Sequence, residues 1–270
     1  MIRYTPLKVA DKMAVIAAGL MYRFLKKGRR QVFENLTHIF AREKLPPDAY
    51  NRYARKTFQN FARCLTDFLR LGFMTSKELL ESVEPVGMDN CLKALQHKRG
   101  CVLITFHIGN WDYAGSYLAA LGVPMSALVE ELEPAMYELY TRHRERTGME
   151  TFPIAKSAYA FLDVIKNNRV LAILADRDIA KNGITVNIFG GKRSIPGNLG
   201  HIIVKKKIPV VFGYMVLNHP HRKHRYFGLV EPPLFFSDVD DFNRLLVTKM
   251  EETVRKNPDQ WFVFQPEWIE

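Results

Sequence analysis

Two side chains that can exchange a proton stand close together in the sequence His-Ile-Gly-Asn-Trp-Asp, which spans residues 107–112. His107 precedes Asp112 by five positions, and on one continuous helix such positions point about 140° apart. If the chain turns at Gly109 instead, the Asp112 carboxylate can reach one imidazole nitrogen. That contact would fix the tautomer of His107 and raise the basicity of its other nitrogen, which could then take a proton from a hydroxyl group.

The elements around His107 place it at the end of a strand. Residues 101–106 form a short apolar run with β-branched side chains, which predicts a buried strand. Asn110 is typical of a helix N-cap, Asp112 then lies in the first turn, and residues 113–121 predict the helix itself. Ligands of open α/β sheets bind beyond the carboxyl ends of the strands, which favours a functional role for His107. The alternative, which the pattern alone leaves open, is a core histidine beside a helix-capping aspartate.

A second charged group follows the buried strand that is predicted over residues 170–175. Asp176, Arg177 and Asp178 are costly at the end of such a strand unless they are paired or belong to a site. They can order one another, shape a site or orient a polar substrate. A surface turn is the alternative.

The composition indicates a globular chain with an anionic partner. Of the 270 residues, 47% are apolar, which excludes a disordered chain, and the net charge is +11. The three cysteines are widely spaced and form neither a zinc pattern nor a disulfide framework. Histidines over residues 219–224 could bind a metal, but the adjoining cations oppose it, so we expect no metal site. No RNA-binding signature is present, and we expect no nucleic-acid partner.

The N-terminal segment is a candidate for membrane contact. No apolar run reaches the roughly 20 residues that cross a bilayer. Residues 1–27 contain a shorter apolar stretch, Met13 to Phe24, among many basic side chains, so this segment could lie as a helix in the membrane interface. An ordinary amphipathic helix packed on the domain is the alternative.

The order of predicted elements indicates an α/β fold with a mainly parallel central sheet flanked by helices and an N-terminal helical layer. Residues 1–71 show only helical periodicity, and strands and helices alternate from residue 101 onward. We therefore expect one domain over residues 1–270, with a helical layer over 1–84 and an α/β core over 85–270. No serine or cysteine nucleophile motif, P-loop or dinucleotide fingerprint is present, so direct transfer aided by a general base is the simplest enzymatic interpretation.

Several ordered blocks together resemble the lysophospholipid acyltransferase superfamily. The similarity is to its bacterial glycolipid branch, which contains the lipid A late acyltransferases and the phosphatidylinositol mannoside acyltransferases. It covers nearly the whole chain. The blocks are residues 84–89, His107 to Asp112, residues 175–178, 188–190 and 196–197, and Asn257-Pro258-Asp259-Gln260-Trp261. The Glu-Gly-Thr-Arg block of glycerol-phosphate acyltransferases is absent, and Asp-Arg at 176–177 is similar to the mannoside-acylating group.

The resemblance implies a glycerol-3-phosphate acyltransferase-like fold and a reaction at the cytoplasmic face of the inner membrane, with peripheral or monotopic attachment. A fatty acyl group would pass from a thioester on acyl carrier protein or coenzyme A to a hydroxyl of a membrane glycolipid, such as a lipid A precursor or a phosphatidylinositol mannoside. The thioester is a co-substrate, and no cofactor is expected. The basic excess would then serve anionic lipids and an acidic donor.

The resemblance also implies roles for single residues. His107 would be the general base and Asp112 its orienting carboxylate. Arg144 would bind a charged head group or donor phosphate, with Arg142 or Arg146 as alternatives, and Glu130 would pair with that arginine. Asp176, Arg177 and Asp178 would complete the polar wall of the substrate site.

Two other functions remain open at this level. A lipid hydrolase or thioesterase would use the same histidine to activate water. A non-catalytic basic protein that binds membranes would need no histidine chemistry at all.

Overall fold

A sheet of seven strands is the centre of the structure. The computed structural model describes residues 4–43, 45–130, 133–218 and 222–269. In this part of the chain the strand order is β1-β9-β8-β2-β5-β3-β4, and every neighbouring pair is parallel except β8 and β9. The strands are β1 (Val83–Val86), β2 (Cys101–Thr105), β3 (Met125–Val129), β4 (Glu150–Pro153), β5 (Val170–Leu174), β8 (Val210–Leu217) and β9 (Tyr226–Val230). The predicted α/β class with a mainly parallel sheet is therefore confirmed.

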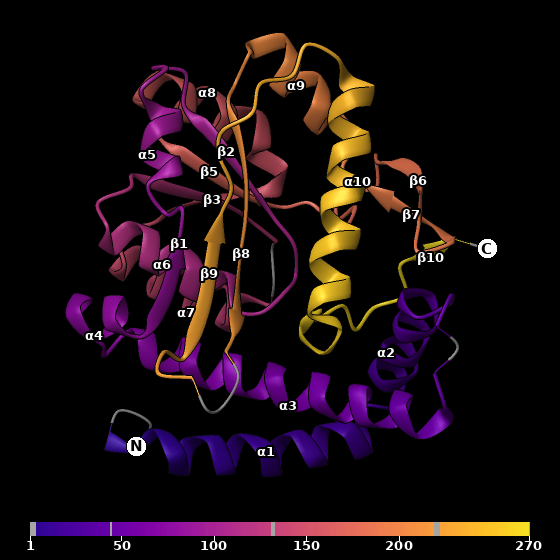
Figure 1. Ribbon diagram of the computed structural model, residues 1–270. Coiled ribbons are helices and arrows are strands. Elements are labelled where there is room, and N and C mark those ends of the chain that lie inside the picture. Colours follow the sequence, from indigo (N-terminus) through magenta and orange to yellow (C-terminus); the bar gives the residue numbers. More distant parts are fainter. Residues whose placement is uncertain (1–3, 44, 131–132, 219–221, 270) are drawn as a thin grey trace.

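Helices cover both faces of this sheet (Figure 1). On β2, Ile104 points into a core with α8, α9 and α10, whereas Leu103 points into a core with α3, α5 and α6. The side chains of β2 are buried on both faces, as expected for a central parallel strand. The helices are α4 (Ser76–Glu81), α5 (Asn90–Leu95), α6 (Trp111–Ala120), α7 (Pro134–Arg146), α8 (Ser157–Asn167), α9 (Asn198–Lys206) and α10 (Val239–Lys256).

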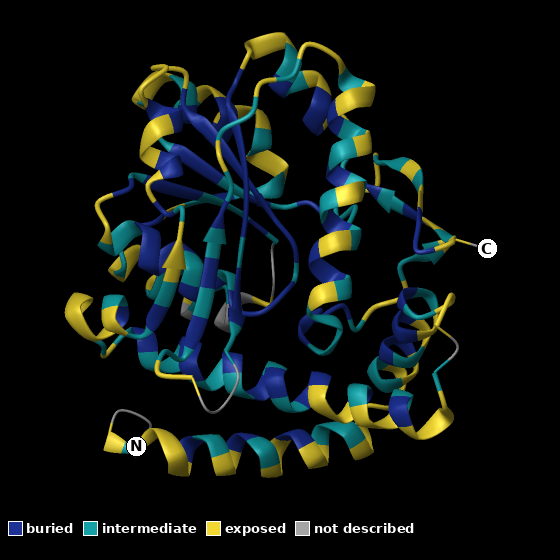
Figure 2. Ribbon diagram, in the orientation of Figure 1, coloured by how far each residue is buried: buried dark blue, intermediate teal, exposed yellow. Residues whose placement is uncertain are grey.

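Three N-terminal helices form a separate layer, as predicted. They are α1 (Leu7–Phe24), α2 (Lys26–Ile39) and α3 (Pro47–Leu71). A third core, which includes Leu36 and Phe58, joins them to each other, and α3 also packs Phe68 against the sheet core. Figure 2 shows a nearly continuous exposed edge along the outer side of α1. Within the described ranges no helix is long and apolar enough to cross a membrane.

Three elements, α4, β1 and β7, were not predicted because their sequences lack apolar periodicity. The residues that follow the long N-terminal helices contain α4 and the edge strand β1, whose residues include Glu84 and Pro85. A small antiparallel sheet, β10-β7-β6, includes the unpredicted strand β7. Its strands are β6 (Ile184–Ile188), β7 (Gly191–Ile195) and β10 (Trp268–Ile269).

Candidate active site

The parallel register of β2 and β5 brings His107 and Asp176 together. Thr105, the last residue of β2, is paired with Leu174, the last residue of β5. The pairing continues past the strands, because Ala175 N donates to Thr105 O at 2.9 Å. His107 and Asp176 each follow two residues after these ends, so the register sets them side by side at the carboxyl edge of the sheet.

The carboxylate of Asp176 holds the imidazole of His107 in place. Nδ1 of His107 lies 2.8 Å from Oδ1 of Asp176, and the His107 backbone N–H donates to both carboxylate oxygens at 3.1 Å. Trp261 Nε1 donates to Oδ2 at 2.8 Å. The carboxylate is fully buried, whereas the histidine side chain is 14% exposed. No described residue bonds to Nε2 of His107, so this nitrogen remains available to a substrate.

These contacts also explain the acidity of Asp176. Burial alone would raise the pKa of its carboxyl group, yet the pKa lies at about 2. The charge and hydrogen bond of His107 lower it most, followed by the hydrogen bond of Trp261 and the charge of Arg193. Asp176 is therefore a permanently ionised acceptor for the Nδ1–H of His107 at neutral pH.

The expectation that Asp112 orients His107 is wrong. No hydrogen bond or ion pair joins the two side chains in the described part of the protein. Asp112 lies in the first turn of α6, where its Oδ1 accepts from Nε of Arg144 on α7 at 2.7 Å. Since Nδ1 of His107 is already bonded to Asp176, the two carboxylates take different partners.

The turn between β2 and α6 depends on Gly109. Its φ of +59° is in the left-handed region, and a Cβ at this position would lie 1.9 Å from Met215 O. The backbone N–H of Gly109 donates to Gln260 O at 2.8 Å, and Phe262 N donates to His107 O at 2.7 Å. The C-terminal segment around residue 261 thus fixes the loop from the other side.

Asn110 caps α6 as predicted, since its side chain accepts from Tyr113 N at 3.1 Å. Its amide group donates to Cys64 O and to the Tyr226 hydroxyl, at 3.1 and 2.9 Å. The start of α6 is therefore tied to α3 and β9.

No motif in the sequence indicated a role for Arg193, which is fully buried on β7. Its Nη2 donates to Asp176 O at 3.1 Å, and its guanidinium carbon lies 4.9 Å from the ring centroids of Trp261 and Trp268. An arginine inside a strand would have indicated a buried polar role, but β7 was not predicted as a strand. Arg193 supports the backbone of Asp176 and the indole that bonds its carboxylate.

The remaining predicted residues line the same region with other pairings. Arg177 donates from Nε to Glu267 at 2.7 Å and from Nη1 to Glu130 at 3.3 Å. Glu130 thus pairs with Arg177, and the expected partner Arg144 is held by Asp112. Asp178 accepts from Gly183 N at 2.8 Å and from the Ser194 hydroxyl at 2.9 Å, so its contacts organise the loop after β5.

Of the three arginines considered on α7, only one faces this region. Arg142 pairs with Glu138 on the exposed side of the helix. Arg144, in contrast, is largely buried at the Asp112 contact and lies over the Tyr140 ring. Of the histidines considered for a metal, His219 and His221 lie outside the described residues, and a ring nitrogen of His224 lies 3.0 Å from Glu81 O.

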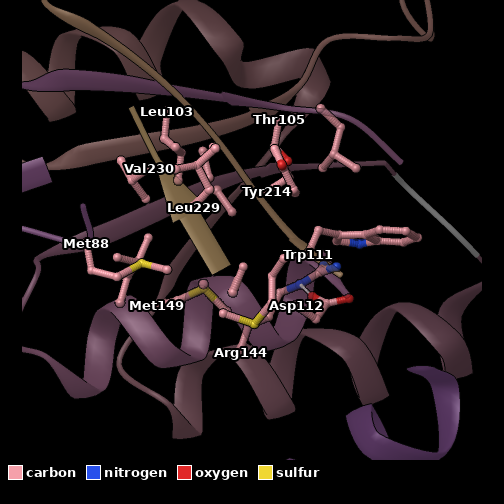
Figure 3. A pocket seen from close by; sticks show the side chains of 18 of the residues that line it. Met88, Leu103, Thr105, Trp111, Asp112, Arg144, Met149, Tyr214, Leu229 and Val230 are labelled. Atoms are coloured by element: carbon pink, nitrogen blue, oxygen red, sulfur yellow. Dashed lines mark hydrogen bonds and ion pairs between the residues drawn. The ribbon is translucent and has the colours of Figure 1, made fainter. Parts of the chain in front are cut away.

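Two cavities meet beside His107. The larger, of about 390 Å³, is lined by His107 and by Arg177, Asp178 and apolar side chains of α8 and α9. The smaller, of about 50 Å³, is apolar and runs between the sheet and α6. Trp111, Leu128, Arg144 and Leu174 line both. Figure 3 shows Trp111 and the Asp112–Arg144 pair at one end of the smaller cavity and Met88 at the other.

The arrangement is suited to deprotonating a group that enters the larger cavity. A histidine whose Nδ1–H is held by a buried carboxylate presents a basic Nε2, and an apolar cavity beside it can take a hydrocarbon chain.

The family comparison agrees with this chemistry. Residues 1–270 match the family model described as bacterial lipid A biosynthesis acyltransferase. A phosphatidylinositol mannoside acyltransferase of Mycolicibacterium smegmatis is 27% identical over 271 residues, which cover 96% of this chain and 86% of that protein. A protein of the same name from Mycobacterium tuberculosis is 27% identical over 263 residues, covering 93% and 80% of the two chains. This chain belongs to the bacterial lipid A biosynthesis acyltransferase family and is an acyltransferase.

Proposed function

We propose that this acyltransferase moves a fatty acyl chain from an acyl thioester to a hydroxyl of a membrane glycolipid, with His107 as general base. The observation that carries the proposal is the His107–Asp176 pair: His107 lines the larger cavity, which shares Trp111 and Leu174 with the smaller, apolar cavity. Nε2 of His107 takes the proton of the acceptor hydroxyl as the oxygen attacks the thioester carbonyl. The imidazolium then gives that proton to the departing thiolate, so the histidine returns to its neutral state.

Asp176 is the positioning carboxylate in this proposal, in place of Asp112. It fixes the tautomer with the proton on Nδ1 and stabilises the imidazolium that forms during attack. Asp112 instead holds the guanidinium of Arg144 where the two cavities meet. There the arginine can bind an anionic group of the donor or the acceptor, while Arg177 and Asp178 form the polar wall on the other side.

The smaller cavity is the proposed site of the acyl chain. Its space comes from small residues on facing elements, because Ala127 and Ala172 are paired between β3 and β5 and Gly115 faces them from α6. Met88, Met149 and Met215 are the flexible part of its wall. Unbranched thioether side chains can repack, which allows a narrow cavity to widen around a hydrocarbon chain.

The acceptor is proposed from the relatives and from the charge of the chain. The similar mycobacterial proteins are named for phosphatidylinositol mannoside, so we propose a glycolipid of that class or a lipid A precursor as the acceptor. The net charge of +11 suits an acidic donor, either acyl carrier protein or the phosphates of coenzyme A.

The outer face of α1 is the proposed contact with the membrane. Met13, Ile16, Leu20 and Phe24 are between 56% and 69% exposed and follow one another at helical spacing. Basic residues flank this stripe, as expected of a helix lying in an anionic interface. We therefore propose peripheral attachment at the cytoplasmic face of the inner membrane.

Product analysis tests the proposal. The purified enzyme is given acyl carrier protein or coenzyme A thioesters together with candidate glycolipids in vesicles, and mass spectrometry counts acylated lipid and free fatty acid. We expect a glycolipid with one added acyl chain, and no product from a folded His107→Ala variant. Free fatty acid as the main product would instead identify a thioesterase or lipid hydrolase.

A further inference from the structure

A cavity of about 320 Å³ lies between α1, α2 and α3, away from the candidate active site. It is lined by Ala18, Gly19, Tyr22, Arg23, Arg29, Arg55 and Gln59. Three arginines from three different helices therefore converge on one opening, and no carboxylate lines it. None of the three forms an ion pair with a described acidic residue, in contrast to Arg144, Arg177 and Arg225.

Two of the three arginines lie against one aromatic ring. The guanidinium carbons of Arg29 and Arg55 both lie 5.3 Å from the ring centroid of Tyr22. The same ring packs edge-on against Phe58 in the core of the helical layer. Arg29 also donates to Tyr22 O at 3.2 Å. Two cations fixed on one ring repel each other, so an anion between them would relieve that repulsion.

The position of the cavity relates it to the membrane stripe on α1. Arg23 follows Ile16 by seven residues, about two helical turns, so both lie on the same side of the helix. Leu20 and Phe24, which are exposed, lie on the same two turns as the cavity residues Gly19 and Arg23. A helix resting on a bilayer through this stripe would therefore place the cavity at the level of the lipid headgroups.

We propose that this cavity binds the phosphate of an anionic phospholipid headgroup and so fixes how the enzyme lies on the membrane. Guanidinium groups suit this ligand because their planar N–H donors match two phosphate oxygens at once. The site is separate from the reacting groups, and the inference rests on the membrane contact of α1 proposed above but not on the proposed reaction. It would orient the molecule on the bilayer whatever the enzyme acylates.

Vesicle sedimentation tests the site with variants of equal charge. The cavity variant is Arg23→Gln/Arg55→Gln, and the matched control is Arg30→Gln/Arg52→Gln, whose two arginines are exposed on α2 and α3 outside the cavity. Arg29 is left unchanged because its side chain donates a hydrogen bond to the backbone carbonyl of Tyr22, near the end of α1. Vesicles contain phosphatidylcholine with or without phosphatidylglycerol, and circular dichroism verifies that each variant is folded.

We expect the cavity variant to lose at least about tenfold more affinity for phosphatidylglycerol vesicles than the control, because each exposed charge alone accounts for about fivefold. The variant Arg23→Lys/Arg55→Lys, which keeps both charges, should still lose more than the control. Equal losses of vesicle affinity in the two Gln variants would mean that the cavity arginines contribute only general surface charge, and would overturn the proposal.

A second measurement separates the two sources of phosphate. The thermal unfolding midpoint of the wild type is recorded with inorganic phosphate and without vesicles. If phosphate stabilises the wild type while the cavity variant binds vesicles as well as the control does, the site takes free phosphate and the headgroup proposal is wrong. Activity on water-soluble short-chain substrates should be the same in the wild type and the cavity variant.

Discussion

At the scale of single residues, two aspartates near one histidine do different work. Asp176 is buried beneath the imidazole and accepts from its Nδ1, its backbone N–H and an indole. Asp112 carries a buried ion pair with Arg144. We infer that the first arrangement sets the position of the proton on His107 and that the second sets the shape and charge of the cavity beside it.

Asp176→Asn should lower kcat by roughly 10³ to 10⁴ with little change in KM, because an amide at this position favours the wrong imidazole tautomer. The decrease in kcat caused by Asp112→Asn should be at least about tenfold smaller than that caused by Asp176→Asn. The main effect of Asp112→Asn should be a higher KM, because the change releases Arg144. Steady-state kinetics on both variants measures the difference. A larger loss of kcat in Asp112→Asn would return the orienting role to that residue.

The acidity of Asp176 predicts how stability depends on pH. Its pKa of about 2 lies below the value of an unfolded aspartate, so the ionised carboxylate contributes stability above about pH 4 that is lost as the pH falls toward 2. A shift of this size corresponds to about 2 kcal/mol. Urea unfolding should therefore show the wild type's advantage over Asp176→Asn shrinking by that amount between pH 5 and pH 2. A difference that stays constant over this range would contradict the shifted pKa.

At the scale of elements, strand ends and one glycine set the geometry of the site. The parallel register of β2 and β5 aligns His107 with Asp176, and the left-handed turn at Gly109 lets the chain pass close to β8 before α6 begins. Neither feature needs a long side chain, so the site is positioned mainly by backbone.

Gly109→Ala should destabilise the protein by more than about 2 kcal/mol and abolish turnover, because its Cβ would overlap Met215 O. Gly122→Ala is the matched control, since φ is +83° there but nothing lies within 4 Å of the added Cβ. Chemical denaturation of both variants separates close approach from backbone strain. Equal losses of unfolding free energy in the two variants would mean that the close approach to Met215 O adds no destabilisation.

Ala172→Leu should shorten the preferred acyl chain, because it fills the apolar cavity between the sheet and α6. Each methylene that no longer fits forfeits about 0.8 kcal/mol of burial. Competition among thioesters of different length, read by mass spectrometry, measures the preference. Ala41→Leu, at an exposed position after α2, should leave the preference unchanged. An unchanged profile in Ala172→Leu would place the acyl chain elsewhere.

At the scale of the whole molecule, the proposed membrane contact lies on the helical layer and the candidate active site lies in the α/β core. The helix α1 presents an apolar stripe on its exposed side, while α3 carries side chains into the sheet core. Anchoring through the layer would hold the core, and the mouth of its cavities, at a fixed height above the bilayer.

The substitution Ile16→Glu/Phe24→Glu should weaken vesicle binding at least about tenfold, because two exposed apolar side chains would no longer enter the interface. Leu162→Glu changes a leucine on α8 that is 59% exposed and lies far from α1, and this variant should bind vesicles as the wild type does (Figure 1). Sedimentation with vesicles measures the binding of both variants and of the wild type. Similar behaviour of all three proteins would remove the membrane role of α1.

Much of this architecture could be predicted from the sequence, and the missing part has a physical reason. The two strands before the site, predicted over residues 101–106 and 170–175, follow from apolar patterning. The pairing of His107 with Asp176 could not be predicted in this way, because it depends on strand order. In the sheet, β2 lies beside β5 rather than beside β3, the next strand in the chain. Arg193 was missed since β7 has no apolar alternation to mark it as a strand.

A double-mutant cycle on turnover tests the central claim most directly. Acyl transfer is measured for His107→Ala, Asp176→Asn and the variant with both changes. Because the two side chains act as a unit, we expect the double variant to be no slower than His107→Ala alone, with each single change costing about 10³-fold or more. Losses that multiply, or a folded His107→Ala enzyme that keeps its turnover, would contradict a His107 base oriented by Asp176.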